Sequence, residues 1–293
     1  MAFGPYLLLA TLEGLVTAAV LALTALGLSL VFGVMRVVNV AHGEFFMLGA
    51  VLAWGVSTAF AGHPSIGFAA ALLVAPLVVG GVALLSERLV LRRLGYEPEA
   101  TIVATIGLLY IVQQLALSFY GADARPVQAP FNIRIQLPWF GYSGYKLFVI
   151  VAAIMLMIAT WFVLTRTKAG LVMRATQYDR ETAQAFGIPV DRVYAGVFAL
   201  GAMLAAIAAV LIVPIQQAHY LMGRDPLLLS FIVVIIGGLG SLRGTVIAAL
   251  LIGLSDGIIS VFFSPTLAKM LATALVAMVL VFRPQGLFGT VAR

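Results

Sequence analysis

Apolar residues occur along this chain in long uninterrupted runs rather than in the alternating or one-sided patterns of soluble strands and helices. A run of about 20 apolar residues is long enough for a helix to cross the hydrocarbon core of a bilayer. Such runs occur at 5–35, 43–61, 66–86, 100–120, 146–165, 194–217, 227–240, 244–263 and 266–282. The pattern predicts an all-α fold, a polytopic bundle of transmembrane helices.

One of these runs is too short for a regular span. The stretch 227–240 has 14 residues, and a helix of that length rises about 21 Å against ~30 Å of hydrocarbon. It either extends past Gly240 or is a broken or re-entrant segment. We therefore expect eight or nine crossings, in a single transmembrane domain that covers residues 1–293.

The composition excludes two other classes of protein. Hydrophobic residues make up 63% of the 293 residues and charged residues 10%, whereas soluble domains are about 25% charged. Neither a soluble globule nor a disordered chain can carry so much apolar sequence. The chain has no cysteine, so disulfides and cysteine-based metal or redox sites are excluded as well.

The basic residues predict the orientation of the bundle. With nine alternating spans, 12 of the 17 basic residues fall on one side, and basic residues concentrate in cytoplasmic loops. The C-terminus and the loop 166–193 are then cytoplasmic, while the N-terminus and the loop 121–145 lie outside. This topology accounts for the net charge of +6 without a nucleic-acid partner. Because no Lys or Arg precedes Arg36, we expect the first run to be retained rather than cleaved as a signal peptide.

Two parts of the chain resemble each other at an offset of 201 residues. Residues 28–53 and 229–254 each contain an apolar helix, a short interruption and a second apolar helix, and Gly43 matches Gly244. Interrupted helices at corresponding places in two halves indicate the central site of a transporter. Apolar helices also resemble one another by chance, so the internal repeat with broken helices is one of two interpretations.

A short polar segment follows the first run. It contains Arg36, Asn39, His42, Gly43 and Glu44, between helices that carry almost no other polar groups. Ionisable groups at membrane depth are costly and usually face a cavity or one another. A helix that resumes at Glu44 would aim its free N–H groups at an anion such as a carboxylate. The alternative is a cytoplasmic turn in which Asn39 caps the next helix.

Glycines gather in the second interruption, at Gly237, Gly238 and Gly240. They permit a broken helix that lines a pathway, or simply a close approach between packed helices. Thr105 lies on the polar side of the fourth run and is a candidate pathway residue, with interhelical hydrogen bonding as the alternative.

The cytoplasmic loop contains a predicted helix at 169–186, with Gly187 as its C-cap and Pro189 just beyond. Its charges are of both signs, which suits docking into a groove on a soluble partner better than binding a lipid surface. A plain amphipathic linker is the alternative. The candidate docking residues are Arg174, Asp179, Arg180, Glu181, Ala183 and Gly187.

No enzyme chemistry is evident in the sequence. The chain has no H-E-x-x-H pattern, no nucleophile–base set and no phosphate-binding G-x-x-x-x-G-K-[ST] loop. We therefore expect no catalytic residue and no metal site. A pump built from this chain would draw its energy from another chain or from an ion gradient.

Several segments together resemble a known family. They are Asn39-Val-Ala-His42-Gly43-Glu44, Arg174-Ala-Thr with Asp179-Arg-Glu and Gly187-Ile, the Gly-Gly-Leu-Gly-Ser stretch at 237–241, and the closing Phe282-Arg-Pro. They run from the first span to the last. The chain resembles permease subunits of the branched-chain amino-acid ABC transporter family, and most closely the H-type subunit.

The resemblance implies an importer in the bacterial inner membrane. Two permeases, the second one a paralogue, would form the pathway, two cytoplasmic ATPases would bind the ATP, and a periplasmic binding protein would deliver the substrate. The chain itself would need no cofactor. The loop helix would be the coupling helix, although such helices often carry E-A-A-x-x-x-G and this chain has Thr182 at the middle position.

The expected function is therefore import of branched-chain amino acids by alternating access. Two alternatives remain open. A permease of the same family could carry urea or short amides. An ion-coupled secondary carrier would work without ATPases and would use Glu44 or Asp256 as its ion site.

Overall fold

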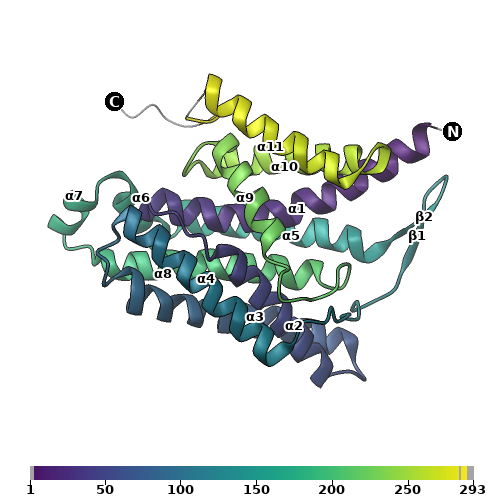
Figure 1. Cartoon of the computed structure of the whole chain (residues 1–293), viewed down its shortest axis with the longest axis horizontal. Helices are drawn as coiled ribbons and strands as arrows, with labels where there is room; N and C mark the ends of the chain where they lie inside the picture. Colours follow the sequence, from purple (N-terminus) through teal and green to yellow (C-terminus); the bar gives the residue numbers. More distant parts are fainter. Residues whose placement is uncertain (1–2, 284, 289–293) are drawn as a thin grey trace.

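The computed structural model describes residues 3–283 and 285–288. Within these residues the chain forms eleven α-helices, one turn of π-helix and one β-hairpin (Figure 1). The helices are α1 (Phe3–Met35), α2 (His42–Ala59), α3 (Pro64–Ser86), α4 (Pro98–Tyr120), α5 (Gly144–Arg166), α6 (Lys168–Tyr178), α7 (Arg180–Ala185), α8 (Val190–Ile212), α9 (Arg224–Gly237), α10 (Leu242–Phe262) and α11 (Pro265–Phe282). The π-helical turn η1 (Glu87–Leu91) continues α3, and the hairpin consists of β1 (Arg134–Gln136) and β2 (Gly141–Ser143).

Each of the nine apolar runs is helical, and the shortest of these helices is α9. Seven helices of the described chain are long and apolar enough to span a membrane: α1, α3 with η1, α4, α5, α8, α10 and α11. The remaining two, α2 and α9, have 18 and 14 residues. The all-α membrane bundle is therefore confirmed, with seven candidate spans that agree roughly with the eight or nine crossings expected.

The long helix α1 forms the centre of the bundle. It packs against α8, α9, α10 and α5, and its apolar core residues form one cluster with those of α2, α3 and α8. By contrast, α4, α5 and α11 expose most of their apolar side chains. In water such faces would be unstable, but in lipid they carry no penalty because acyl chains are as apolar as they are.

Small residues let α10 approach α1 closely. A side chain on Gly253 would overlap Ala18, and one on Gly257 would overlap the backbone of Gly14. Spacing small residues four apart places them on one helix face and brings two backbones together, which gains dispersion energy in a solvent that provides no hydrophobic drive.

At the first interruption the chain turns back into the bundle, and residues 36–41 are called the re-entrant segment below. Helix α1 ends where Arg36 adopts a left-handed conformation (φ 56°), and residues 36–41 then run back along the bundle without helical structure. Helix α2 begins at His42, two residues earlier than the resumption at Glu44 expected from the sequence. The His42 ring contacts the Thr24 carbonyl, eleven residues before the end of α1, so α2 starts about 16 Å inside the bundle.

The predicted loop helix 169–186 is wrong in one respect, because it is two helices. Helix α6 ends at Tyr178 and α7 begins at Arg180, with Asp179 in an extended conformation between them. The Asp179 carboxylate accepts hydrogen bonds from the N–H groups of Glu181 and Thr182, an N-cap that starts a new helix. These helices lie at one end of the bundle, and the N-terminus and the β-hairpin lie at the other (Figure 1).

The contact between α1 and α10 gives a test of the fold. We expect Gly257→Ala to lower the stability of the purified protein by ~1–3 kcal/mol, the usual cost of overpacking, because its methyl group would overlap α1. Gly81→Ala in α3 is the matched control, since a methyl group there meets nothing within 4 Å. Thermal melting in detergent measures both, and equal melting temperatures would contradict the packing.

Candidate functional site

The inner ends of α2 and α9 meet halfway along the bundle. The backbones of Gly43 and Gly223 touch, so that a side chain on either glycine would overlap the other residue's carbonyl. Gly223 is the N-cap of α9 and Gly43 lies in the first turn of α2. Two helix N-termini, each with a partial positive charge, therefore lie next to each other at the centre of the molecule.

Buried polar side chains hold the backbone that leads into α2. The side-chain oxygen of Asn39 accepts a hydrogen bond from the Ala41 N–H (3.1 Å), and the hydroxyl of Thr105 accepts one from the Val40 N–H (3.2 Å). His42 Nε2 donates to the Thr24 carbonyl at 2.9 Å. A non-helical backbone at membrane depth needs such partners, since lipid supplies none. Asn39, His42 and Thr105 thus lie around the start of α2, and each bonds to a backbone group.

Glu44 lies in the first turn of α2 and is buried. Its Oε2 has no hydrogen-bond partner within the described residues. Arg224, in the first turn of α9, acts on this carboxylate electrostatically. The junction thus contains an acidic residue from α2 and a basic residue from α9, in addition to the glycine contact.

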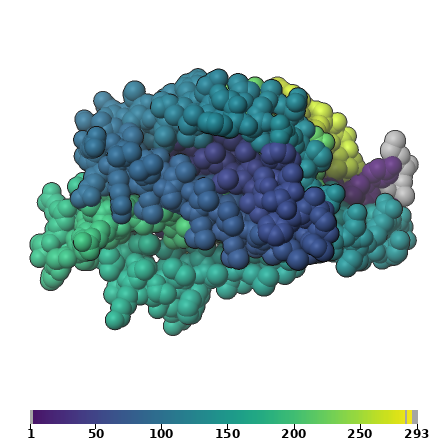
Figure 2. Space-filling model, turned by 90° about the horizontal axis from the view of Figure 1, so that it is seen from below, coloured from purple at the N-terminus to yellow at the C-terminus, as the bar shows by residue number. Residues whose placement is uncertain are grey.

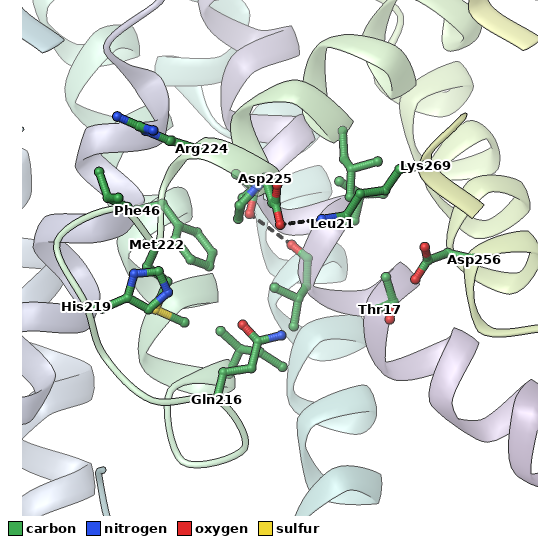
Figure 3. Close-up of a pocket in the computed structure, with 16 residues that line it drawn as sticks. Thr17, Leu21, Phe46, Gln216, His219, Met222, Arg224, Asp225, Asp256 and Lys269 are labelled. Carbon is green, nitrogen blue, oxygen red and sulfur yellow. Dashed lines mark hydrogen bonds and ion pairs between the residues drawn. The ribbon is translucent and has the colours of Figure 1, made fainter. Parts of the chain in front are cut away.

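A cavity of about 410 Å³ lies beside this junction (Figure 3). Its lining comes from α1, α2, α8, α9, α10, α11 and the connection between α8 and α9. The polar and charged members are Thr17, Thr24, Gln216, His219, Arg224, Asp225, Asp256 and Lys269. Apolar members include Val20, Leu21, Phe46, Met222 and Leu229. The volume falls in the range of small-molecule sites, ~300–1,000 Å³.

The charges around the cavity are two acids and two bases. Lys269 and Asp225 form an ion pair of 2.6 Å, drawn in Figure 3. Arg224 and Asp256 form no ion pair within the described part of the chain. The hydrophobic pattern does not single out Arg224, Asp225 or Lys269. A signal was nevertheless present, because Arg224 and Asp225 directly precede the one run too short to span a membrane.

The glycines of the second interruption lie elsewhere, at the far end of α9. Gly238 and Gly240 adopt positive φ angles of 98° and 77°, which end α9 and turn the chain into α10. Side chains on Gly237 or Gly240 would overlap Gly244 or crowd Gly33 of α1. In the structure these glycines bring α1, α9 and α10 together and do not line the cavity.

The two short helices α6 and α7 form an exposed surface at the end of the bundle. An apolar groove of about 500 Å³ runs between them, lined by Leu171, Val172, Ala175, Tyr178, Asp179, Thr182, Ala183, Phe186 and Ile188. Tyr178 and Phe186 are 90% and 84% exposed. Figure 2 shows this green part of the chain projecting at the end opposite the purple N-terminal helix.

The candidate docking residues have distinct places on this surface. Arg180 lies over the rings of Tyr96 and Tyr194, at 5.9 and 5.6 Å, and so fastens α7 to the chain that precedes α4 and to α8. Ala183 is the buried residue of α7, and Gly187 follows that helix with a positive φ of 80°. Glu181 is exposed, and Arg174 makes only long contacts to backbone carbonyls.

Two groups in this region have shifted acidities. Hydrogen bonds from the Thr182 side chain and backbone hold the pKa of Asp179 below its ordinary value, so this cap is a carboxylate at neutral pH. Burial and a 2.6 Å hydrogen bond donated to Glu87 raise the pKa of the Tyr96 hydroxyl. Tyr96 is therefore a neutral platform for the Arg180 guanidinium.

Comparison with known proteins agrees with this architecture. The family described as branched-chain amino acid transport system, permease component, matches residues 10–281. The permease protein BraD of Pseudomonas aeruginosa, named for high-affinity branched-chain amino acid transport, is 26% identical over 94% of both chains. LivH of Escherichia coli is also 26% identical, over 97% of this chain and 96% of its own length. A probable LivH of Methanocaldococcus jannaschii is 25% identical over 95% and 91%.

The resemblance seen in the sequence is thereby confirmed over nearly the whole chain. A permease component of an ATP-binding-cassette system works with ATPase and substrate-binding subunits and is not itself an enzyme. This chain belongs to the branched-chain amino acid transport system permease family, as a multi-pass membrane component of such a transporter.

Proposed function

We propose that this chain moves branched-chain amino acids into the cytoplasm by alternating access, driven by ATPases on partner chains. The observation that carries the proposal is the pairing of a central cavity with an exposed apolar surface at one end of the bundle. Membership of a transport-system permease family supports this interpretation of both features. In this proposal the cavity binds the substrate, and the surface docks on an ATPase.

The surface formed by α6 and α7 is suited to an ATPase groove. Tyr178 and Phe186 are large, apolar and almost fully exposed, and exposed aromatic residues of this kind anchor protein interfaces. Arg174, Asp179, Arg180 and Glu181 add charges of both signs around them. The surface would dock on one of two ATPases, and a second permease, a paralogue, would engage the other.

Movement of this surface has a direct route to the cavity. Gln177 of α6 lies against Gly33 and Gly240, where α1, α9 and α10 meet. Helix α9 runs from that junction to Arg224 at the cavity. A push on α6 would therefore shift one end of α9, and its other end would reshape the cavity. In this role Gly237, Gly238 and Gly240 form the hinge between α9 and α10, and its movement opens the pathway.

The re-entrant segment would form the wall on the other side. Asn39, His42, Gly43, Glu44 and Thr105 fix the start of α2 against α1 and α4. Phe46, one turn further along α2, lines the cavity. Because this wall is held by several buried hydrogen bonds, we assign it the static role while α9 moves.

The orientation follows from the charges. The end of the bundle that carries α6 and α7 is rich in Lys and Arg, and we assign it to the cytoplasm of a bacterial inner membrane. The β-hairpin and the N-terminus would then face a periplasmic binding protein that delivers the amino acid.

Purification and reconstitution test the function. The tagged chain should co-purify with ATPases and a second permease in mild detergent. The reconstituted complex should accumulate leucine, isoleucine or valine in liposomes only with ATP and a loaded binding protein. Uptake by this chain alone under an ion gradient would contradict the proposal and favour a secondary carrier. ATP-driven uptake of urea or short amides, without branched-chain amino acids, would contradict the proposed substrate.

Arg180 provides a test of the coupling surface. We expect Arg180→Gln to lower ATP-driven uptake by about ten-fold, since two cation–π contacts are together worth ~1–2 kcal/mol and their loss frees α7 from Tyr96 and Tyr194. Uptake per ATP hydrolysed in proteoliposomes measures the coupling. Arg192→Gln is the matched control, because Arg192 is an exposed residue of the same end with no ion pair inside the described ranges. Equal loss in both variants would reduce the effect to one of surface charge.

Asp179 provides a second test, with a defined pH dependence. Asp179→Ala should lower coupled uptake because α7 loses its N-cap, whereas Asp179→Asn should retain most of it because the amide oxygen still caps. Since the pKa of Asp179 is depressed, its contribution to stability is complete above the ordinary value of 3.8 and is lost only as the pH falls below it. Wild-type coupling should therefore not change through this group between about pH 5 and 8. Uptake measured across that interval checks this, and a matching loss in the Asn variant would rule out a capping role.

A further inference from the structure

A second hollow lies on the outer surface of the bundle, between α5 and α10. Both helices pack on α1, and the hollow between them has a volume of about 390 Å³. Its floor is Leu26 of α1, and its walls include Ile158 and Trp161 of α5 and Val246 and Ile247 of α10. Ile158, Trp161 and Ile247 are exposed, so this α5–α10 groove opens to the surroundings of the bundle. It shares no lining residue with the central cavity.

The α5–α10 groove lies at the depth of one leaflet. Gly33 of α1 lies against Gly240, just before α10 begins, and Leu26 is seven residues earlier in α1, about 10 Å further from that end. The hydrocarbon core is ~30 Å thick, so the groove belongs to the half of the bilayer next to α6 and α7. Water is scarce at this depth, and an empty hollow would forfeit dispersion contacts. An acyl chain is therefore the solvent that can fill it.

One charged side chain lines this otherwise apolar groove. It is Arg243, which lies in the first turn of α10 and is exposed. Arg243 forms no ion pair with any described residue. The hydroxyl of Thr160 also lines the groove, but it donates to the Leu156 carbonyl at 2.8 Å. A guanidinium group is thus left for a ligand at the end of the groove that faces the membrane surface.

The surroundings of Arg243 are positive. The two stretches that form the walls, residues 144–178 and 226–255, contain no Asp or Glu. Arg166 and Lys168 are exposed where α5 ends and α6 begins, at the same end of the bundle. Arg243 also lies near the N-terminus of its helix, where the dipole favours an anion over a cation. This end of the groove is therefore complementary to a negatively charged group.

We propose that the α5–α10 groove binds an anionic phospholipid such as phosphatidylglycerol, with the phosphate at Arg243 and one acyl chain along Leu26. Basic pockets between transmembrane helices on the cytoplasmic side of a membrane favour anionic headgroups in this way. Trp161 suits the same position, since indole rings lie at the membrane–water interface. The lipid would fill the space between α5 and α10 and hold the start of α10, which follows the hinge at Gly237–Gly240. This site does not depend on which solute the transporter carries.

Trp161 provides a natural reporter of lipid in the groove. The chain has three tryptophans, and the substitutions Trp54→Phe and Trp139→Phe leave Trp161 alone in the full chain. Bromine atoms on an acyl chain quench an indole that they contact. Vesicles of brominated phosphatidylglycerol in phosphatidylcholine, and of the reverse mixture, therefore report the relative affinity of the two lipids for this groove. We expect phosphatidylglycerol to bind about five-fold more tightly, the usual effect of one basic residue near a membrane surface.

Three further variants separate the groove from general surface charge. Arg243→Gln should bring the two affinities to within about two-fold of each other. Arg192→Gln is the matched control, since it removes an exposed cation of the same end that does not line the groove, and it should keep the preference. Val246→Phe keeps every charge but places a larger side chain in the groove, so it too should reduce the preference to within about two-fold. Melting in detergent checks that each variant is folded.

These measurements decide the site without any transport assay. Equal loss of preference in Arg243→Gln and Arg192→Gln, or an unchanged preference in Val246→Phe, would show that anionic lipids gather by general surface charge alone, which overturns the site. Equal affinities of the two lipids for the unaltered groove overturn it as well. Native mass spectrometry then examines the chain purified with its partner chains, where the wild type should retain phosphatidylglycerol that Arg243→Gln loses. If the wild-type complex retains none, a partner chain such as a second permease covers the groove, and the lipid site is wrong.

Discussion

The close contact between Gly43 and Gly223 is the constraint on which the centre of this protein depends. Two helices begin there, inside the bundle, and each has N–H groups that no residue of its own helix can satisfy. Placing two such ends together would be unfavourable without compensation. The compensation comes from an acidic residue in the first turn of each helix, Glu44 in α2 and Asp225 in α9, and from the hydrogen bonds that Asn39, His42 and Thr105 provide.

This arrangement separates two tasks that the sequence presents together. The polar segment Asn39–Glu44 is the most conspicuous part of the chain, yet Asn39 bonds to the backbone of the segment itself and His42 to the backbone of α1. The cavity lies beside this segment, and its charged residues come from the start of α9 and from the last two helices. A conspicuous cluster of polar residues in a membrane protein can thus be the support of a site and not its lining.

Much of the fold could be predicted because its determinants are local. Each apolar run became a helix, and the short run 227–240 became the short helix α9 (Arg224–Gly237). The division of the loop helix could also have been predicted, since Asp179 is a strong N-cap residue. The single helix predicted for 169–186 missed this break because hydrophobic periodicity does not take N-cap residues into account. The cavity could not be predicted in this way. Arg224, Asp256 and Lys269 belong to three helices, and only the packing of those helices shows that they share one space.

Helix α9 has a further consequence that follows from its length alone. It connects the junction touched by α6 with the cavity and contains 14 residues, so it is a stiff lever arm of about 21 Å. A rotation of about ten degrees at one end displaces the other by ~4 Å, which is close to the width of a methyl-branched side chain. A full-length span would have to drag its lipid-facing surface through the same angle. A short helix that ends inside the protein can instead convert a small tilt into an opening while the outer boundary of the bundle stays in place.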